Sequence, residues 1–378
     1  MIPFNKVHLT GKEIHYIEEA LRTQTSGNGI FTKKCQDLIS QKYNFKKTLL
    51  TTSCTDALEI ASLLLEIKPG DEVIIPSFTF VSTANAFVLR GAKIVFADSS
   101  DEHPNIDVSA LETYITGRTK AIVVVHYAGV AVDMDEVMNL AMKYNLCVVE
   151  DAAQAINATY KKRPLGGIGH LGCFSFHDTK NIICGEGGAL VINDERFVKR
   201  AEILWEKGTN RSAFIRGEVD KYGWVDVGSS FLPSEITAAC LLAQLEHVNE
   251  IHEKRLNAWS YYHEKFGQVF PSHGATIPQV PNHARHNAHI YYLRCSDLEQ
   301  RNFLLQVLKK NGIQAYFHYP PLHLSHYYLQ SHKPQKLPNA AKYFEQIVRL
   351  PLFTDISSSD QDQVINEVKR AFGGFPNG

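Results

Sequence analysis

A lysine follows closely on a hydroxyl residue that ends a short apolar run. Residues 173–181 read CFSFHDTKN, with Ser175 at the end of the run and Lys180 shortly after it. An uncharged lysine amine is a nucleophile that attacks aldehydes, but most lysines in proteins are solvated surface charges. Considered alone, Lys180 therefore fits a surface position better than a reactive one. Only the residues that accompany it can support a reactive role.

Two more apolar runs end in groups suited to hold a charged ligand. LCVVED ends in Asp151, and Gln154 follows about one helical turn later. TLLTTSCTDAL places Ser53, Cys54 and Thr55 where a helix begins. Free amides at a helix start attract anions, and hydroxyl groups add further donors. Asp151 and the hydroxyl residues fit ordinary helix caps equally well, so neither group is decisive by itself.

The run EVIIPSFTF adds two aromatic rings, Phe78 and Phe80, which could stack on a flat ligand although core packing is their commoner use. An amine, a carboxylate, an aromatic plate and an anion cradle are what pyridoxal 5′-phosphate requires. The amine bonds to the cofactor aldehyde, and the carboxylate keeps the pyridine nitrogen protonated. Because these groups occur together at successive strand ends, they predict a pyridoxal phosphate site built on Lys180 and Asp151.

The elements that must position these groups alternate along the chain. From residue 47 onward, short β-branched runs alternate with helical spacing, including helices expected over 55–66, through the 80s and over 135–144. The runs are almost uninterrupted apolar, which is typical of parallel strands covered on both faces. We therefore expect an α/β fold with a mostly parallel sheet, whose ligand-binding groups gather at the carboxyl ends of the strands.

The length of the chain predicts two domains. With 378 residues, it exceeds the ~250–300 residues at which a single core usually stops growing. Helical spacing dominates from residue 197 to about 266, and the strand-like runs HARHNAHIYYLRC and IQAYFHY then alternate with helices expected near 297–311 and 338–349. We place a large domain with the N-terminal segment over 1–249 and a smaller α/β domain over 250–378.

Composition excludes several classes of protein. The 39 basic residues balance 40 acidic ones, so the positive field of a nucleic-acid binder is missing. The seven cysteines include no CxxC pair, which argues against a disulfide framework or zinc knuckle and favours a reducing compartment. Neither a secretory leader nor an apolar run of ~18 residues is visible. We expect a cytoplasmic protein with a small-molecule partner and no membrane span.

Two glycine-rich stretches lack the context of a nucleotide-binding loop. Gly167, Gly169 and Gly172 spell GxGxxG, but they precede a strand, whereas the dinucleotide fingerprint follows one. GEGGAL lacks the lysine and hydroxyl pair of a P-loop. Both stretches are therefore predicted to be turns.

Five histidines invite a metal interpretation. His283, His286 and His289 recur every third residue, but in a strand this spacing points them to opposite faces, and no acidic or cysteine ligand accompanies them. We expect packing roles for this trio and no metal. His318 and His323 flank YPPL on a rigid loop, where substrate contact and a structural role are equally plausible.

A polar cluster follows a predicted helix in EKGTNRS. It contains Lys207, Asn210 and Arg211, whose donors suit a diphosphate. A solvated loop is an equally good interpretation, so the cluster is a candidate substrate site only.

Several longer motifs resemble those of the sugar aminotransferases, which are fold-type-I pyridoxal phosphate enzymes acting on nucleotide-linked keto sugars. The resemblance runs through nearly the whole chain and is carried by TSCTDAL, PGDEVIIPSFTFVSTANA, VHYAG, VVEDAAQA, GCFSFHDTKN, EGGAL and HYPPLH. It implies a nucleotide sugar and L-glutamate as substrates, and a homodimer with active sites at the subunit interface.

The resemblance also implies a role for individual residues. Lys180 would bond to the cofactor aldehyde, Asp151 would pair with the pyridine nitrogen, and Gln154 would lie near the phenolic oxygen. Phe80 would cover one face of the ring. The phosphate would be bound by Cys54, Thr55 and Ser175.

Two positions depart from the family pattern. Cys54 stands where many relatives have glycine, so its side chain must fit beside the cofactor. Ser230 stands where many relatives donate an asparagine from the neighbouring subunit, which leaves that phosphate contact open.

A narrower set of motifs concerns the sugar. MIPFN, NAFVLRGAKIVF and EKGTNRSAFIRGEVDKYGWVDVGSS are similar to members that aminate dTDP-4-keto-6-deoxyglucose at C4 for enterobacterial common antigen and related glycans. A sister enzyme acting at C3, or at C4 with the opposite configuration, remains open. A sugar dehydratase would have histidine in place of Lys180. A non-catalytic regulator conflicts with the intact Lys180, Asp151 and Ser175, and a nicotinamide enzyme conflicts with the misplaced glycines.

Overall fold

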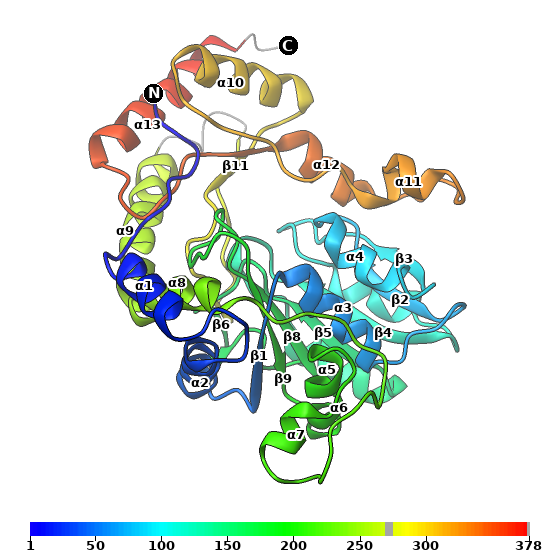
Figure 1. The fold of residues 1–378 in the computed structure, drawn as a ribbon. Coiled ribbons are helices and arrows are strands. Elements are labelled where there is room, and N and C mark those ends of the chain that lie inside the picture. Colours follow the sequence, from blue (N-terminus) through cyan, green and yellow to red (C-terminus); the bar gives the residue numbers. More distant parts are fainter. Residues whose placement is uncertain (269–274, 376–378) are drawn as a thin grey trace.

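A computed structural model describes residues 1–268 and 275–375 (Figure 1). Its largest sheet has seven strands in the order β1-β9-β8-β5-β4-β2-β3. They are β1 (Lys47–Thr51), β2 (Glu72–Pro76), β3 (Lys93–Ala97), β4 (Thr119–Val125), β5 (Cys147–Asp151), β8 (Leu171–Ser175) and β9 (Gly188–Ile192).

The sheet is mostly parallel, as the sequence predicts, with one exception. Strands β8, β5, β4, β2 and β3 pair in parallel, whereas β9 pairs antiparallel with both β8 and β1. A parallel connection needs a crossover, usually through a helix. The connection from β8 to β9 contains no helix, so the chain turns back on itself, and this turn carries Lys180.

Helices cover both faces of this sheet (Figure 1). Successive residues of β4 point to opposite sides: Ile122 and Val124 join one apolar cluster, and Ala121 and Val123 join the other. The first cluster packs against α1 (Glu13–Thr23), α2 (Ile30–Tyr43), α5 (Met134–Tyr144) and α8 (Glu235–Glu246), and the second against α3 (Cys54–Leu64), α4 (Val81–Val88) and α6 (Glu195–Trp205). The helices expected over 55–66, in the 80s and over 135–144 are confirmed.

The C-terminal part has a third apolar cluster of its own, which also includes Ile2. It joins α9 (Val248–Gly267), α10 (Leu298–Lys310), α13 (Ser358–Gly374) and the antiparallel pair β11 (Tyr292–Arg294) and β12 (Ile347–Arg349). Helix α9 begins in the first cluster with Val248 and continues into the third with Trp259. The domain boundary at 249/250 stays a prediction.

Two expectations about elements are wrong. The helical spacing from residue 197 to about 266 is interrupted, because residues 206–234 hold only a five-residue helix, α7 (Arg211–Ile215). IQAYFHY forms isolated bridges at Ile313 and Tyr316 instead of a strand, because its partners are single residues of the N-terminal segment and of β12. The helix expected over 338–349 is confirmed as α12 (Pro338–Gln346), which ends where β12 begins.

Several short elements complete the described chain. A small sheet joins β10, β6 and β7. Its strands are β6 (Thr159–Tyr160), β7 (Arg163–Pro164) and β10 (Ala284–Arg285). The other short elements are α11 (His326–Leu329) and the 3-10 turns Val108–Tyr114, Tyr127–Gly129 and Leu322–Leu324.

The N-terminal segment ties the two parts of the molecule together. In Figure 1 it starts near α13 and descends to α1. The Ile2 amide donates to the Gly312 carbonyl at 2.8 Å, and the Gln314 amide donates to the Ile2 carbonyl at 3.0 Å. Among the described residues, none of the helices combines the length and apolarity that crossing a bilayer demands.

Candidate active site

A cavity of about 640 Å³ lies at the carboxyl ends of the central strands. Val125, Asp151 and Ser175, the last residues of β4, β5 and β8, all line it. This is where a parallel α/β sheet is expected to bind its ligand. The candidate site residues that line the cavity are Cys54, Thr55, Phe80, Asp151, Gln154, Ser175, Lys180 and His318.

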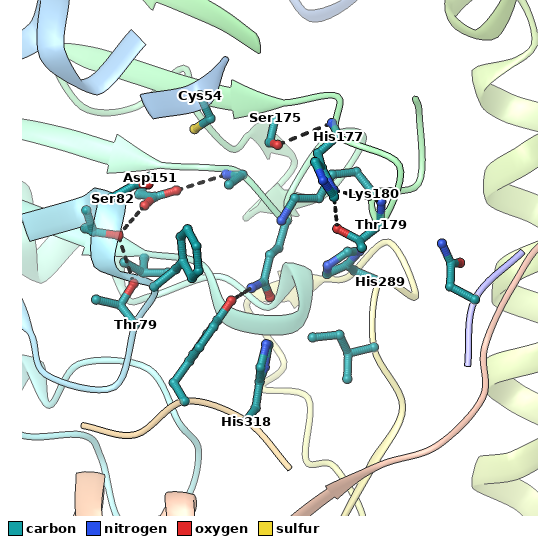
Figure 2. Close-up of a pocket in the computed structure, with 18 of the residues that line it drawn as sticks. Cys54, Thr79, Ser82, Asp151, Ser175, His177, Thr179, Lys180, His289 and His318 are labelled. Carbon is teal, nitrogen blue, oxygen red and sulfur yellow. Dashed lines mark hydrogen bonds between the residues drawn. The ribbon is translucent and has the colours of Figure 1, made fainter. Parts of the chain in front are cut away.

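Lys180 lies in the turn between β8 and β9 and extends into the middle of the cavity (Figure 2). The turn is held by hydrogen bonds from the Lys180 amide to the His177 carbonyl at 2.8 Å and from the Asp178 amide to the Gly185 carbonyl at 3.2 Å. Gly185 has φ of +83°, a conformation that favours glycine. Burial lowers the pKa of Lys180 and so favours the neutral, nucleophilic amine.

Asp151 is held in one orientation at the end of β5. The Thr83 hydroxyl donates to Oδ2 at 2.7 Å and the Ala153 amide donates to Oδ1 at 3.2 Å. Burial raises the pKa of Asp151, while these two donors lower it. The carboxylate is thus suited to pair with a protonated ring nitrogen. Thr83 was not among the predicted site residues. It lies four residues after Thr79, and because its own proton is donated to Asp151, it accepts a hydrogen bond from the Thr79 hydroxyl at 2.9 Å.

The N-terminus of α3 opens into the same cavity and fits an anion. Ser53 caps the helix by accepting from the Asp56 amide at 3.1 Å, and the Thr55 hydroxyl donates to Ser82 at 2.8 Å. Cys54 is the first residue of α3 and lines the cavity. Burial raises the pKa of its thiol, which favours the uncharged form. Eleven residues of aligned amides make this end of the helix electropositive.

Gln154 and Phe80 line the cavity from two other elements. Gln154 accepts from the Ala128 amide at 2.6 Å and donates to the Tyr319 hydroxyl at 3.1 Å, which fixes its side-chain amide. Phe80 is 56% exposed, whereas Phe78 is 1% exposed and packs in the core. Of the two aromatic candidates, Phe80 therefore is the ring available to a flat ligand.

Four predicted residues lie away from this cavity. Lys207, Asn210 and Arg211 flank the start of α7, where Arg211 pairs with Glu206 at 2.7 Å. Ser230 is exposed and bridges to Glu206 in the backbone. Within one chain these residues do not reach the cavity, so their ligand roles stay predictions.

His323 is buried outside the cavity. Its Nδ1 lies 2.6 Å from the Ser77 hydroxyl, so the structure gives it a packing contact at the end of β2. Because His323 does not line the cavity, its contact with substrate stays a prediction.

The glycines of GGIGHLG enclose a buried carboxylate. The amides of Gly166, Ile168 and Gly169 donate to Glu150 at 2.8, 2.6 and 2.6 Å, and His126 Nε2 lies 2.9 Å from the same group. A Cβ on Gly172 would lie 2.1 Å from the Gly166 carbonyl. The predicted turn is confirmed, and its glycines serve close packing around Glu150.

Sequence reasoning missed three further residues of the cavity: His289, Tyr319 and Arg349. His289 was assigned to packing, yet it lines the cavity with Nδ1 2.9 Å from Asn181 Oδ1. Burial lowers its pKa well below the usual range, so it is neutral. No spacing rule marks such residues, because they come from the C-terminal part and meet the sheet only after folding.

The fold and this site define a fold-type-I pyridoxal phosphate enzyme. The DegT/DnrJ/EryC1/StrS aminotransferase family matches residues 8–369, and the chain belongs to this family. It is therefore an aminotransferase that depends on pyridoxal phosphate.

Relatives span the whole chain. The spore coat polysaccharide biosynthesis protein SpsC of Bacillus subtilis is 33% identical over 377 residues, covering 97% of this chain and 96% of that protein. A putative sugar aminotransferase, Spr1654 of Streptococcus pneumoniae, superposes with a TM-score of 0.91 at 28% identity over 99% of both chains, and its pyridoxal phosphate form superposes at 0.90. DesV of S. venezuelae has a TM-score of 0.90 at 29% identity, with 99% of both chains covered.

Proposed function

We propose that the chain is a nucleotide-sugar aminotransferase, dTDP-4-amino-4,6-dideoxygalactose transaminase. It would transfer an amino group from L-glutamate to the C4 ketone of dTDP-4-keto-6-deoxy-D-glucose, giving dTDP-4-amino-4,6-dideoxy-D-galactose. The observation that carries the proposal is Lys180, with its lowered pKa, in one cavity with Asp151 and the amides of α3. The motifs of the N-terminus and of the 206–230 segment support this particular sugar.

Each residue of the site has its own role in the proposed reaction. Pyridoxal phosphate, when bound, withdraws electrons from the carbon that bears the transferred nitrogen. Lys180 would hold the cofactor through its aldehyde carbon, and its free amine would move a proton between Cα of the donor and C4′ of the cofactor. Asp151 would keep the pyridine nitrogen protonated, and Thr55, Ser175 and the α3 amides would bind the phosphate.

The same lysine sets the new stereocentre of the product. Lys180 delivers a proton from one side, so the galacto or gluco configuration depends on which face of the sugar points toward it. A sister enzyme acting at C3, or at C4 with the opposite configuration, would use the same residues. Product NMR after incubation with each keto sugar distinguishes them, and amination at C3 would replace the substrate proposed here.

We also propose that the enzyme is a cytoplasmic homodimer. Exposed apolar side chains gather on and after α7, in a surface that we call the 214–227 patch. It contains Phe214, Ile215, Tyr222, Trp224, Val225 and Val227. Large exposed apolar surfaces mark association sites. A second copy that covers this patch would bring the segment with Lys207, Asn210, Arg211 and Ser230 toward a neighbouring active site.

Replacement of Lys180 tests the proposal. Lys180→Ala should remove the visible absorption band of cofactor bound to lysine and reduce turnover by roughly 10³-fold or more, because both the covalent anchor and the proton carrier are lost. Absorbance of the purified protein and a coupled 2-oxoglutarate assay measure these effects. Lys369→Ala, an exposed lysine of α13, is the control and should behave as wild type. Normal transamination by Lys180→Ala would refute the role of this residue.

A further inference from the structure

A short segment before β11 forms part of the cavity wall. It comprises residues 287–289, of which Asn287 and Ala288 are fully buried and His289 lines the cavity. The alternating side-chain directions of a strand do not apply to it, because β11 begins only at Tyr292. The direction of the His289 side chain is therefore set by the contacts that hold this segment.

The backbone of this segment is strained and firmly held. Ala288 has φ of +53°, a conformation that residues other than glycine rarely adopt. The buried side chain of Arg255 fixes it by donating to the carbonyls of Ala288 and His289 at 3.2 and 2.9 Å. Such strain costs free energy, persists only where the surrounding contacts impose it, and is commonest at functional sites. The left-handed turn at Ala288 gives His289 a fixed approach to the cavity.

Two asparagines tie the segment to the rest of the cavity wall. Asn287 donates through Nδ2 to the carbonyls of Gln154 and Ile156 at 2.9 and 2.8 Å, so it is anchored to the chain that follows β5. Asn181, the residue after Lys180, donates through Nδ2 to the Asn287 carbonyl at 2.8 Å. The segment therefore has a fixed position relative to the turn that carries Lys180.

The same contact of Asn181 fixes the tautomer of His289. Because Nδ2 of Asn181 donates to a carbonyl, its Oδ1 faces the histidine and lies 2.9 Å from His289 Nδ1. An amide oxygen only accepts hydrogen bonds, so Nδ1 must carry a proton. Burial and then nearby positive charges hold the pKa of His289 well below its usual range, so the ring is neutral and Nε2 has a free lone pair. The charged groups that lower this pKa are Lys180, Arg255, His318 and Arg349.

The Nε2 atom of His289 is free to meet a ligand. It has no hydrogen-bond partner among residues 1–268 and 275–375, and its side chain lines the cavity. Figure 2 shows His289 and Lys180 among the side chains that surround the pocket. Polar atoms in protein interiors are normally paired, so an acceptor left free at a cavity points to a ligand that donates a hydrogen bond.

Of the two proposed substrates, only the sugar offers a suitable donor. The carboxylates of L-glutamate accept hydrogen bonds, and its amine is the group that reacts. The keto sugar carries a hydroxyl on C3, next to the reacting C4 carbonyl. Because Lys180 must reach C4 to deliver its proton, this hydroxyl comes to lie beside Lys180 as well. On the other side of C4, the ring oxygen and the methyl group have no proton to donate.

We propose that His289 accepts a hydrogen bond through Nε2 from the C3 hydroxyl of the keto sugar, and that Asn181 positions His289 for this contact. The inference rests on the proposed amination at C4 and adds a residue that recognises the sugar next to the reacting carbon. A neutral acceptor favours a hydroxyl and disfavours a carboxylate at this place. The contact is therefore specific to the sugar half of the reaction.

A substrate analogue tests the contact without any variant. The 3-deoxy analogue of dTDP-4-keto-6-deoxy-D-glucose keeps the reacting carbonyl and lacks only the C3 hydroxyl. Wild-type holoenzyme should convert it with a kcat/KM roughly 5- to 100-fold lower, because the Nε2 acceptor is left unpaired beside the bound sugar. Equal kcat/KM values for the two sugars would overturn the proposal.

Substitution of His289 separates the acceptor from the packing of the ring. Asparagine has an N–H group near the place of Nδ1, so His289→Asn keeps a donor to Asn181 but has no acceptor at the place of Nε2. It should lower kcat/KM for the parent sugar by the same factor and leave the 3-deoxy analogue unchanged. Glutamine extends an oxygen to the place of Nε2, so His289→Gln should restore part of the discrimination. Equal losses with both sugars in His289→Asn would indicate packing and overturn the proposal.

The amino-donor half of the reaction and a second histidine provide controls. The reaction of the holoenzyme with L-glutamate, without any sugar, is followed by cofactor absorbance, and KM for L-glutamate should be the same in His289→Asn as in wild type. His283 belongs to the same trio of histidines but does not line the cavity, so His283→Asn should keep the wild-type discrimination between the two sugars. A raised KM for L-glutamate in His289→Asn, or lost discrimination in His283→Asn, would overturn the proposal.

The tautomer of His289 can be measured independently of turnover. Heteronuclear NMR of the holoenzyme with isotope-labelled histidine should show, near neutral pH, a neutral ring with a protonated Nδ1 and a bare Nε2, and His289→Asn should lack this signal. A ring protonated on Nε2, or on both nitrogens, would overturn the inference. A protein with the expected tautomer that aminates no 4-keto sugar would instead refute the proposed function, and the sugar contact with it.

Discussion

At the scale of single residues, burial acts in opposite directions on the two groups proposed for catalysis. It lowers the pKa of Lys180 and raises the pKa of Asp151, because an apolar environment disfavours whichever form is charged. Lys180 needs its neutral form to attack an aldehyde, so burial helps it. Asp151 needs its charged form to hold a ring proton, and the hydrogen bonds from Thr83 and Ala153 oppose the effect of burial.

The hydroxyl of Thr83 lowers the pKa of Asp151, so its removal should change the pH dependence of the enzyme. Thr83→Val removes a donor to the Asp151 carboxylate, which raises the pKa of Asp151 further. Since the proposed mechanism needs Asp151 ionised, the acid limb of the plot of kcat against pH should move to higher pH. Turnover near that limb should fall by up to roughly tenfold.

Thr83→Ser is the matched control for this substitution. Serine keeps the hydroxyl and loses only a methyl group, so the acid limb should stay near its wild-type position. If Thr83→Val and Thr83→Ser give the same pH profile, the hydrogen bond to Asp151 does not set the limb.

At the scale of elements, the position of the start of α3, where we propose that the phosphate binds, depends on a glycine in β9. A Cβ on Gly188, the first residue of β9, would lie 2.4 Å from the Ser53 carbonyl carbon and 2.5 Å from the Cys54 nitrogen. Both atoms are backbone, so no rotamer change relieves the clash. The glycines of GEGGAL were predicted to form a tight turn, and the positive φ of Gly185 agrees with this prediction. Gly188, which has no side chain, allows the start of α3 to pack closely against β9.

Gly188→Ala should therefore weaken both stability and cofactor binding. The clash should lower the free energy of unfolding by about 1–3 kcal/mol and displace the start of α3. Thermal unfolding of apo and holo protein measures both effects, and the increase in Tm on adding pyridoxal phosphate should shrink. Gly373→Ala, where a Cβ meets nothing within 4 Å, is the control and should not destabilise the protein. An unchanged cofactor effect on Tm in Gly188→Ala would show that α3 has not moved.

At the scale of the whole molecule, the active site is assembled from parts far apart in the sequence. The cavity is lined by Phe4 from the N-terminal segment, Lys180 from the turn between β8 and β9, and Arg349 from the C-terminal part. The 214–227 patch lies on a different region, at the opposite end of Figure 1 from α10 and α13. An enzyme that needs Ser230 or Lys207 at the active site must therefore use a second copy.

Disruption of the 214–227 patch tests the proposed dimer. The Trp224 side chain is 85% exposed, and its ring is held by a bond from Nε1 to the Asp226 carbonyl at 2.7 Å. Trp224→Glu should shift the protein from dimer to monomer in sedimentation velocity and reduce turnover in parallel, because charged residues are disfavoured in an interface core. Met142→Glu, 82% exposed on α5, should stay dimeric. A Trp224→Glu protein that remains fully dimeric would place the interface elsewhere.

Local patterns alone determined much of this protein. Runs of apolar residues between helical stretches predicted the sheet, and the polar residues at or shortly after the ends of these runs marked Asp151, Ser175 and Lys180 as candidates. The structure brings these three residues to one cavity because strand ends converge at one edge of a parallel sheet, so spacing along the chain becomes proximity in space. Their roles stay predictions.

Only the tertiary structure decided the remaining contacts. The reversal of β9, the placement of Arg349 against Phe4, and the burial of Phe78 depend on which segments pack together. The residues around Phe4 give no sign that Arg349 is their neighbour. Phe4 is held beside β12 by Gln314, which lies 310 positions later in the chain. Contacts of this kind arise from burial of the whole chain, which no local pattern of charge or hydrophobicity encodes.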